Sequence, residues 1–298
     1  MNEDTKTMTQ ETQNREEFIM LPTVDFCFKE LMQNARVRQG MIAALLGVEP
    51  EEIEETILLP TILHTEYPDD KYGILDVKVI LKNETQMDFE MQVAAVSYWT
   101  KRILFYLGKM YTDQLKAGES YDKLKKCIHV GILDFIHFPD DDRCYRKIIF
   151  CDKDTGKEYT DLLEIHVLEL KKLPEKEQNE SGIIRWMRFL GAKSRKEFDK
   201  MAKEDSYIDE VYEMLKHMSA DEKKRLEYEA REKAIRDYHS QMQASREEGR
   251  KEGREEGKKE GVASIITNML RKGKSPEEIA DMTGEDLEEI QEIQKQLL

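Results

Sequence analysis

The chain is poor in the residues that mark secreted, zinc-stabilised or membrane-spanning proteins. Its 298 residues include only four cysteines, and none shows the paired C-x-x-C spacing of a zinc site. No long apolar run lacks charged residues, so we expect neither a transmembrane span nor a secretory signal. These absences predict a cytoplasmic protein with reduced thiols and without a structural metal or disulfide.

Positive charge is also scarce over the chain as a whole. Its 47 Lys and Arg stand against 62 Asp and Glu, which gives a net charge of -15. Such a chain lacks a broad attraction to nucleic acid, because phosphate contacts need local positive charge. One basic stretch over 101–126 contains seven basic and three acidic residues. This stretch has two possible interpretations: a DNA-binding surface, and the solvated face of an ordinary amphipathic helix.

Two adjacent strand-like runs, 73–81 and 87–93, are the most informative feature of the chain. The second run alternates apolar and polar residues, so Glu90 and Gln92 lie on one face of the strand. A polar turn joins the runs and predicts an antiparallel hairpin that brings Asp76 beside Glu90. Paired carboxylates of this kind can hold a hard divalent ion such as Mg²⁺. A half-exposed strand with a merely solvated polar face would show the same alternation.

Hydrophobic periodicity elsewhere predicts a mixed sheet flanked by helices, in an α/β or α+β fold. The expected helices cover 25–46, with a break near Gly40, and 99–116; the further strands cover 56–63, 127–138, 147–151 and 162–170.

The C-terminal part reads as charged helix. Glycine recurs at every fourth residue over 249–261, and each costs about 1 kcal/mol relative to alanine in an isolated helix. Two interpretations of this segment are open: close pairing with another helix along the glycine stripe, and a charged linker. Gly273, Ser275 and Gly284 then predict helix boundaries of a helix-turn-helix-like segment. Its last helix is acidic, which favours contact with a second copy or a partner over reading of DNA bases.

The expected organisation has five parts. They are a disordered tail over 1–20, a core domain over 21–174, a charged helical region over 175–244, the glycine-periodic helix or linker over 245–261, and the helical segment over 262–298.

Five segments of the chain, in order, resemble the PD-(D/E)XK nuclease superfamily, and within it the transposase-like, recombination-promoting nuclease (Rpn-like) group. They cover 21–31, 73–77, 89–92, 101–121 and 162–170. The resemblance implies a restriction-endonuclease-like core with an α-helical C-terminal extension. It also implies a metal-dependent endonuclease that hydrolyses phosphodiester bonds of DNA with Mg²⁺ or Mn²⁺.

Carried over by position, the resemblance assigns metal binding to Asp76, Glu90 and the backbone carbonyl of Met91. Gln92 stands where most of the superfamily has lysine. Because its amide cannot act as a general base, Gln92 orients water or substrate through hydrogen bonds.

Further candidates surround these positions. Asp25 and Glu30 belong to the first predicted helix, from which the superfamily often supplies another carboxylate, although surface helix charges are the more ordinary interpretation. Lys78 lies two residues from Asp76 and so on the same strand face. Candidate DNA contacts in the basic stretch are Lys101, Arg102, Tyr106 and Lys109.

Three functions are consistent with these features. The leading one is an active metal-dependent DNA endonuclease. The second is an inactive nuclease-like protein that binds DNA without cutting it, and the third is an oligomeric interaction scaffold.

Lys78 is a candidate source of the positive charge that Gln92 lacks. We expect Lys78→Met to impair DNA cleavage without changing the folded state, as measured by plasmid nicking beside a urea unfolding curve. Unchanged cleavage would rule out this role.

Overall fold

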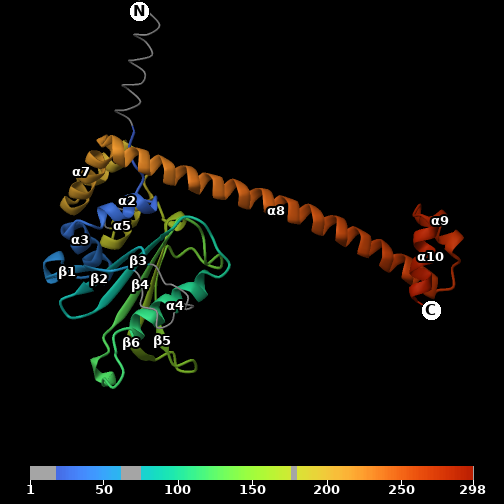
Figure 1. The fold of residues 1–298 in the computed structure, drawn as a ribbon, viewed down its shortest axis with the longest axis horizontal. Helices are drawn as coiled ribbons and strands as arrows, with labels where there is room; N and C mark the ends of the chain where they lie inside the picture. Colours follow the sequence, from blue (N-terminus) through green and yellow to red (C-terminus); the bar gives the residue numbers. More distant parts are fainter. Residues whose placement is uncertain (1–17, 62–74, 176–179, 298) are drawn as a thin grey trace, which may run out of the picture. The chain divides into compact units, whose positions relative to one another are not determined.

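The computed structural model describes residues 18–61, 75–175 and 180–297 (Figure 1). The chain divides into two compact units between Ile235 and Arg236. Most of the predicted N-terminal tail lies outside the described residues, as do 62–63 of the first predicted strand and 73–74 of the predicted hairpin.

A six-stranded mixed sheet in the order β1-β2-β3-β4-β6-β5 forms the centre of the first unit. Strands β3, β4 and β6 run parallel, whereas β1, β2 and β5 run antiparallel to their neighbours. The predicted hairpin is present as β2 and β3, with Val77 opposite Phe89. The expected mixed sheet is therefore confirmed. The strands are β1 (Thr56–Leu59), β2 (Val77–Leu81), β3 (Gln86–Gln92), β4 (Cys127–Leu133), β5 (Tyr145–Cys151) and β6 (Glu158–Glu169).

One face of the sheet packs against helices from both ends of the first unit. Val79, Phe89 and Val130 point to this face, because alternate side chains of a strand lie on the same side of the sheet. All three are fully buried in the core that the helices form with the sheet. The helices over 182–220 contribute to the same apolar core, so they belong to the first unit. The helices on this face are α2 (Asp25–Leu31), α3 (Ala35–Leu46), α5 (Gly182–Gly191), α6 (Arg195–Ala202) and α7 (Ser206–Ala220).

Helix α4 (Trp99–Thr112) covers the other face of the sheet (Figure 1). Its residues Trp99, Ile103 and Leu107 recur at helical spacing and are buried against β4 and β6. Strand β3 is thus covered on both sides, and Asp88 is fully buried while Glu90 is 6% exposed. The interpretation of β3 as a half-exposed strand with a solvated polar face is therefore wrong.

The predicted helix over 25–46 breaks at a different place from the one expected. Helix α2 ends at Leu31, and Asn34 begins α3 by accepting hydrogen bonds from the backbone N–H groups of Arg36 and Val37. Gly40 lies inside α3, so the expected break near it is wrong. A Cβ atom at Gly40 would come within 2.7 Å of Tyr207 Cδ1. This glycine therefore permits a close approach of α3 and α7 and does not end a helix.

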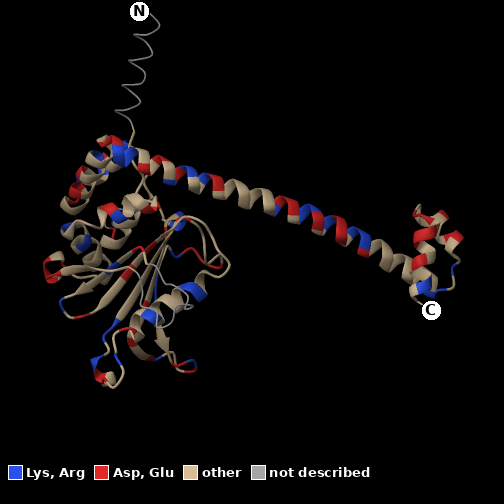
Figure 2. Cartoon of the chain, viewed as in Figure 1, with Lys and Arg blue, Asp and Glu red and all other residues tan. Residues whose placement is uncertain are grey.

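Helix α8 (Glu222–Arg271) includes the glycine-periodic segment, and opposite charges intermingle along it (Figure 2). The segment is therefore helical and is not an irregular linker. Apart from the adjoining residues and backbone of α8 itself, no described atom lies within 4 Å of a Cβ built on any of its four glycines. Pairing of the C-terminal helices with a second copy stays a prediction.

The predicted helix boundaries at Gly273, Ser275 and Gly284 in the second unit are confirmed. Ser275 and Glu278 form a reciprocal capping box at the start of α9 (Pro276–Thr283). Gly273 and Gly284 adopt φ values of 83° and 76°, which suit glycine after a helix end. Helix α10 (Leu287–Gln296) completes a small apolar core. Among the helices that the structure describes, none combines the length and apolar character needed to cross a membrane.

Two helical glycines allow a matched test of the packing between α3 and α7. We expect Gly40→Ala to lower the free energy of unfolding by about 1–3 kcal/mol, because the added methyl group meets Tyr207. Gly108→Ala in α4 meets no described atom within 4 Å apart from the adjoining residues and backbone of its own helix, and should raise the free energy of unfolding by about 0.5–1 kcal/mol. Urea unfolding measures both. A Gly40 variant as stable as the Gly108 variant would contradict the close approach.

Candidate functional site

The register of the β2–β3 hairpin places Asp76 next to Glu90. Asp76 directly precedes β2, and its Oδ2 atom accepts a hydrogen bond of 3.2 Å from the backbone N–H of Met91. Because Val77 is opposite Phe89, the preceding residue falls at the level of Glu90 in the hairpin. The two predicted metal-binding acids therefore lie at the same end of the hairpin, and their role as metal ligands stays a prediction.

Each carboxylate is paired with a cation from a different helix layer. Lys29 of α2 places Nζ 2.9 Å from Asp76 Oδ1. Arg102 of α4 forms an ion pair with Glu90 and also donates a 3.1 Å hydrogen bond to Gln92 Oε1. Lys29 and Arg102 thus neutralise the two acids from opposite sides of the sheet.

Gln92 is held at both ends of its amide. Its Oε1 atom accepts from Arg102, and its Nε2 atom donates a 3.0 Å hydrogen bond to the carbonyl of Ala94. Gln92 therefore lies beside Glu90 in a defined orientation.

The donor atoms suit a hard divalent cation. Asp76, Glu90 and the Met91 carbonyl all offer oxygen, and Glu90 Oε2 is buried without a hydrogen-bond partner among the described residues. The described part of the chain contains no cluster of three or more His, Cys, Asp or Glu side chains placed to hold a metal. Mg²⁺ commonly uses only one or two carboxylates together with water and substrate phosphate. The residues present therefore offer the type of ligand atom that such an ion binds.

A family model described as PD-(D/E)XK nuclease family transposase matches residues 22–245. The chain belongs to this family. The match includes the whole described sheet and the residues of the candidate site, and the mixed α/β fold agrees with it. Comparisons with curated proteins and with solved structures gave no match. The resemblance seen in the sequence is confirmed, and membership supports a nuclease-related function.

The two auxiliary acids of this PD-(D/E)XK family member, Asp25 and Glu30, pair with different cations. Asp25 is 3.8 Å from Lys29 Nζ, so it shares the cation that pairs with Asp76. Glu30 instead forms an ion pair with Lys224 of α8. Asp25 is thus linked to the site through Lys29, whereas Glu30 faces another part of the first unit.

Lys78 lies opposite Asp88 in the hairpin, two residue pairs along from Asp76. Burial lowers the pKa of its ammonium group, and the nearby carboxylates of Asp113 and Asp88 oppose that change. The cation that contacts both Glu90 and Gln92 is Arg102 and not Lys78.

The predicted DNA contacts on α4 do not share one environment. Lys101 is exposed, while Arg102 points inward to Glu90, with the Tyr106 ring centroid 5.7 Å from its guanidinium carbon. Lys109 lies 4.0 Å from Asp113.

Sequence reasoning missed that Arg102 holds the carboxylate of Glu90. The available signal was its place beside the apolar stripe of Trp99 and Ile103, rather than on the outer face of the helix.

A second buried pair beneath the site was also missed. Asp88 Oδ2 lies 2.7 Å from His129 Nδ1, and both residues are fully buried at opposite positions of β3 and β4. The available signal was a histidine within an otherwise apolar strand, facing the polar side of β3. This pair gives Asp88 Oδ2 a partner, whereas Asp88 Oδ1 is buried without a hydrogen-bond partner among the described residues.

We expect Arg102→Met to lower the free energy of unfolding by about 2–4 kcal/mol, because it leaves Glu90 buried without its cation. Lys101→Met on the exposed side of α4 is the matched control and should change it by less than about 0.5 kcal/mol. The double variant Arg102→Met/Glu90→Gln should recover part of the loss in a double-mutant cycle from urea unfolding. Equal stability of the Arg102 and Lys101 variants would refute the pairing.

Proposed function

We propose that the chain is a metal-dependent DNA endonuclease that hydrolyses phosphodiester bonds. The observation that carries this proposal is the convergence of Asp76, Glu90 and Gln92 at the β2–β3 hairpin. Membership of a nuclease family supports the reaction class. The side chains that this reaction needs come from one hairpin, which gives the site a rigid base.

Asp76, Glu90 and the Met91 carbonyl are the groups that would hold Mg²⁺ or Mn²⁺. When bound, such an ion polarises the phosphodiester and lowers the pKa of a bound water. Lys29 and Arg102 add positive charge beside the same carboxylates. Because Arg102 also reaches Gln92, its guanidinium is close enough to the reacting centre to donate hydrogen bonds to phosphate oxygens.

Gln92 serves as an orienting group in this proposal. Its amide offers hydrogen bonds but no site for the proton of an attacking water at neutral pH. The proton must therefore pass to substrate, solvent or a group other than Gln92.

A second candidate function is binding of DNA without cleavage. It is favoured by one observation, namely that both ends of the Gln92 amide already have protein partners. If those hydrogen bonds persist with substrate, Gln92 cannot position a water. Dependence of the activity on a divalent ion separates the two functions.

We expect the purified chain to nick supercoiled plasmid in Mg²⁺ or Mn²⁺ and not in EDTA. Asp76→Ala and Glu90→Ala should each abolish nicking, because each removes an anionic metal ligand. Asp122→Ala, which removes an exposed carboxylate after α4, is the matched control and should nick like wild type. Unfolding curves verify that all variants are folded.

Nicking that persists in both folded carboxylate variants would overturn the proposed site. An inert wild type that still binds DNA in a gel shift would instead favour the second candidate function.

A further inference from the structure

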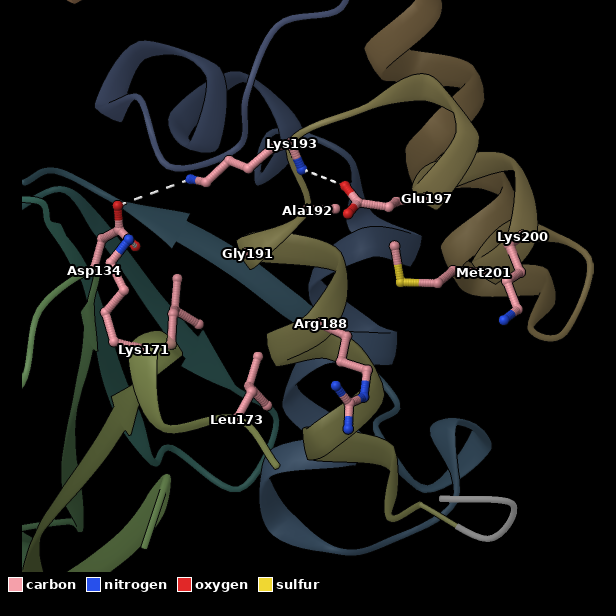
Figure 3. Close-up of a pocket in the computed structure, with 11 residues that line it drawn as sticks. Asp134, Lys171, Leu173, Arg188, Gly191, Ala192, Lys193, Glu197, Lys200 and Met201 are labelled. Carbon is pink, nitrogen blue, oxygen red and sulfur yellow. Dashed lines mark hydrogen bonds and ion pairs between the residues drawn. The ribbon is translucent and has the colours of Figure 1, made fainter. Parts of the chain in front are cut away.

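A cavity of about 330 Å³ opens just beyond the C-terminal end of β4 (Figure 3). Its charged lining consists of the cations Lys171, Arg188, Lys193 and Lys200 and the acids Asp134 and Glu197. This cluster of basic side chains belongs to a chain whose net charge is -15. Local rather than overall charge therefore governs what the cavity attracts.

The acids of the cavity are already engaged by protein groups. Asp134 lies 3.0 Å from Lys171 Nζ and 3.8 Å from Lys193 Nζ, so two ammonium groups share one carboxylate. Glu197 accepts the backbone N–H groups of Lys193 and Ser194 at the start of α6. The two lysines thus carry one positive charge in excess of Asp134.

These lysines are free to exchange partners with solutes. The side chains of Lys171 and Lys193 are 50% and 45% exposed. Ion pairs exposed to this extent contribute only about 0–1 kcal/mol, so replacing Asp134 by another anion costs little. By contrast, Arg188 is held by Glu180 and is 17% exposed.

The cavity adjoins the proposed cleavage site. The backbone N–H of Asp134 donates a 3.0 Å hydrogen bond to the carbonyl of Gln92, at the ends of the neighbouring strands β4 and β3. Adjacent strands are about 4.8 Å apart, so the cavity begins one strand away from Gln92. Lys193 Nζ also lies 3.4 Å from Thr23 Oγ1, just before the helix that supplies Lys29.

We propose that Lys171 and Lys193 bind a backbone phosphate of a nucleic acid next to the phosphate at the Asp76–Glu90 site. This inference rests on the proposed function for its placement beside the scissile bond. Asp134 pairs with both ammonium groups until a phosphate displaces its carboxylate. Lysine suits this role because its ammonium acts as a mobile point charge.

The test measures binding of a short fluorescent DNA duplex by anisotropy in EDTA, so that no cleavage is needed. We expect Lys171→Gln/Lys193→Gln to raise Kd roughly tenfold at about 100 mM salt and to reduce the salt slope by about 1. The control Lys153→Gln/Lys157→Gln removes the same charge from the exposed β5–β6 turn, at the far end of β6. It should leave Kd within about twofold, since phosphate contacts act locally.

Asp134→Asn supplies a change of opposite sign. It releases both lysines from their competing carboxylate and should tighten DNA binding, whereas a purely structural role of the cluster predicts no tightening. Urea unfolding of each variant verifies that the compared proteins are folded.

The results separate this inference from the proposed cleavage reaction. Weaker binding of the cavity double variant alone supports the phosphate site even if wild type never nicks plasmid. If wild type nicks plasmid while both double variants bind DNA equally, the cavity inference is wrong and the nuclease stands. Absence of DNA binding by wild type, or failure of Asp134→Asn to tighten it, also overturns the inference.

Discussion

Burial of β3 on both faces is the constraint on which the candidate site depends. One face of this strand carries Met87, Phe89 and Met91 into the main core, and the other carries Asp88 and Glu90 beneath α4. Carboxylates that leave water need hydrogen bonds or opposite charges. His129 satisfies this need for Asp88 and Arg102 for Glu90, so the polar face of one strand determines what its neighbours must supply.

The cations around the site come from elements that are distant in sequence. Lys29 belongs to α2, Arg102 to α4, and Lys171 and Lys193 follow β6 and α5. They gather near the C-terminal ends of the parallel strands, where open α/β sheets commonly bind ligands. An acidic chain can therefore gather several cations at one place, because attraction at short range depends on nearby charges.

The second unit shows how local signals can suffice where a large core is absent. Its short helices begin and end at Ser275, Gly273 and Gly284, and three isoleucines form the centre of its apolar cluster. Along α8 the glycine-periodic segment remains helical in spite of a propensity cost of about 1 kcal/mol per glycine. Charge and helix punctuation thus describe this part of the chain better than core packing does.

Local patterns were enough to predict the β2–β3 hairpin, the shared face of Glu90 and Gln92, and the boundaries of α9. Each follows from periodicity or turn chemistry within a few residues. Local patterns did not predict that the polar face of β3 is buried, that Arg102 turns inward or that the first helix breaks at Asn34 instead of Gly40. Those outcomes depend on which layer covers a strand and how closely two helices approach, and such contacts join residues too far apart for local patterns to specify.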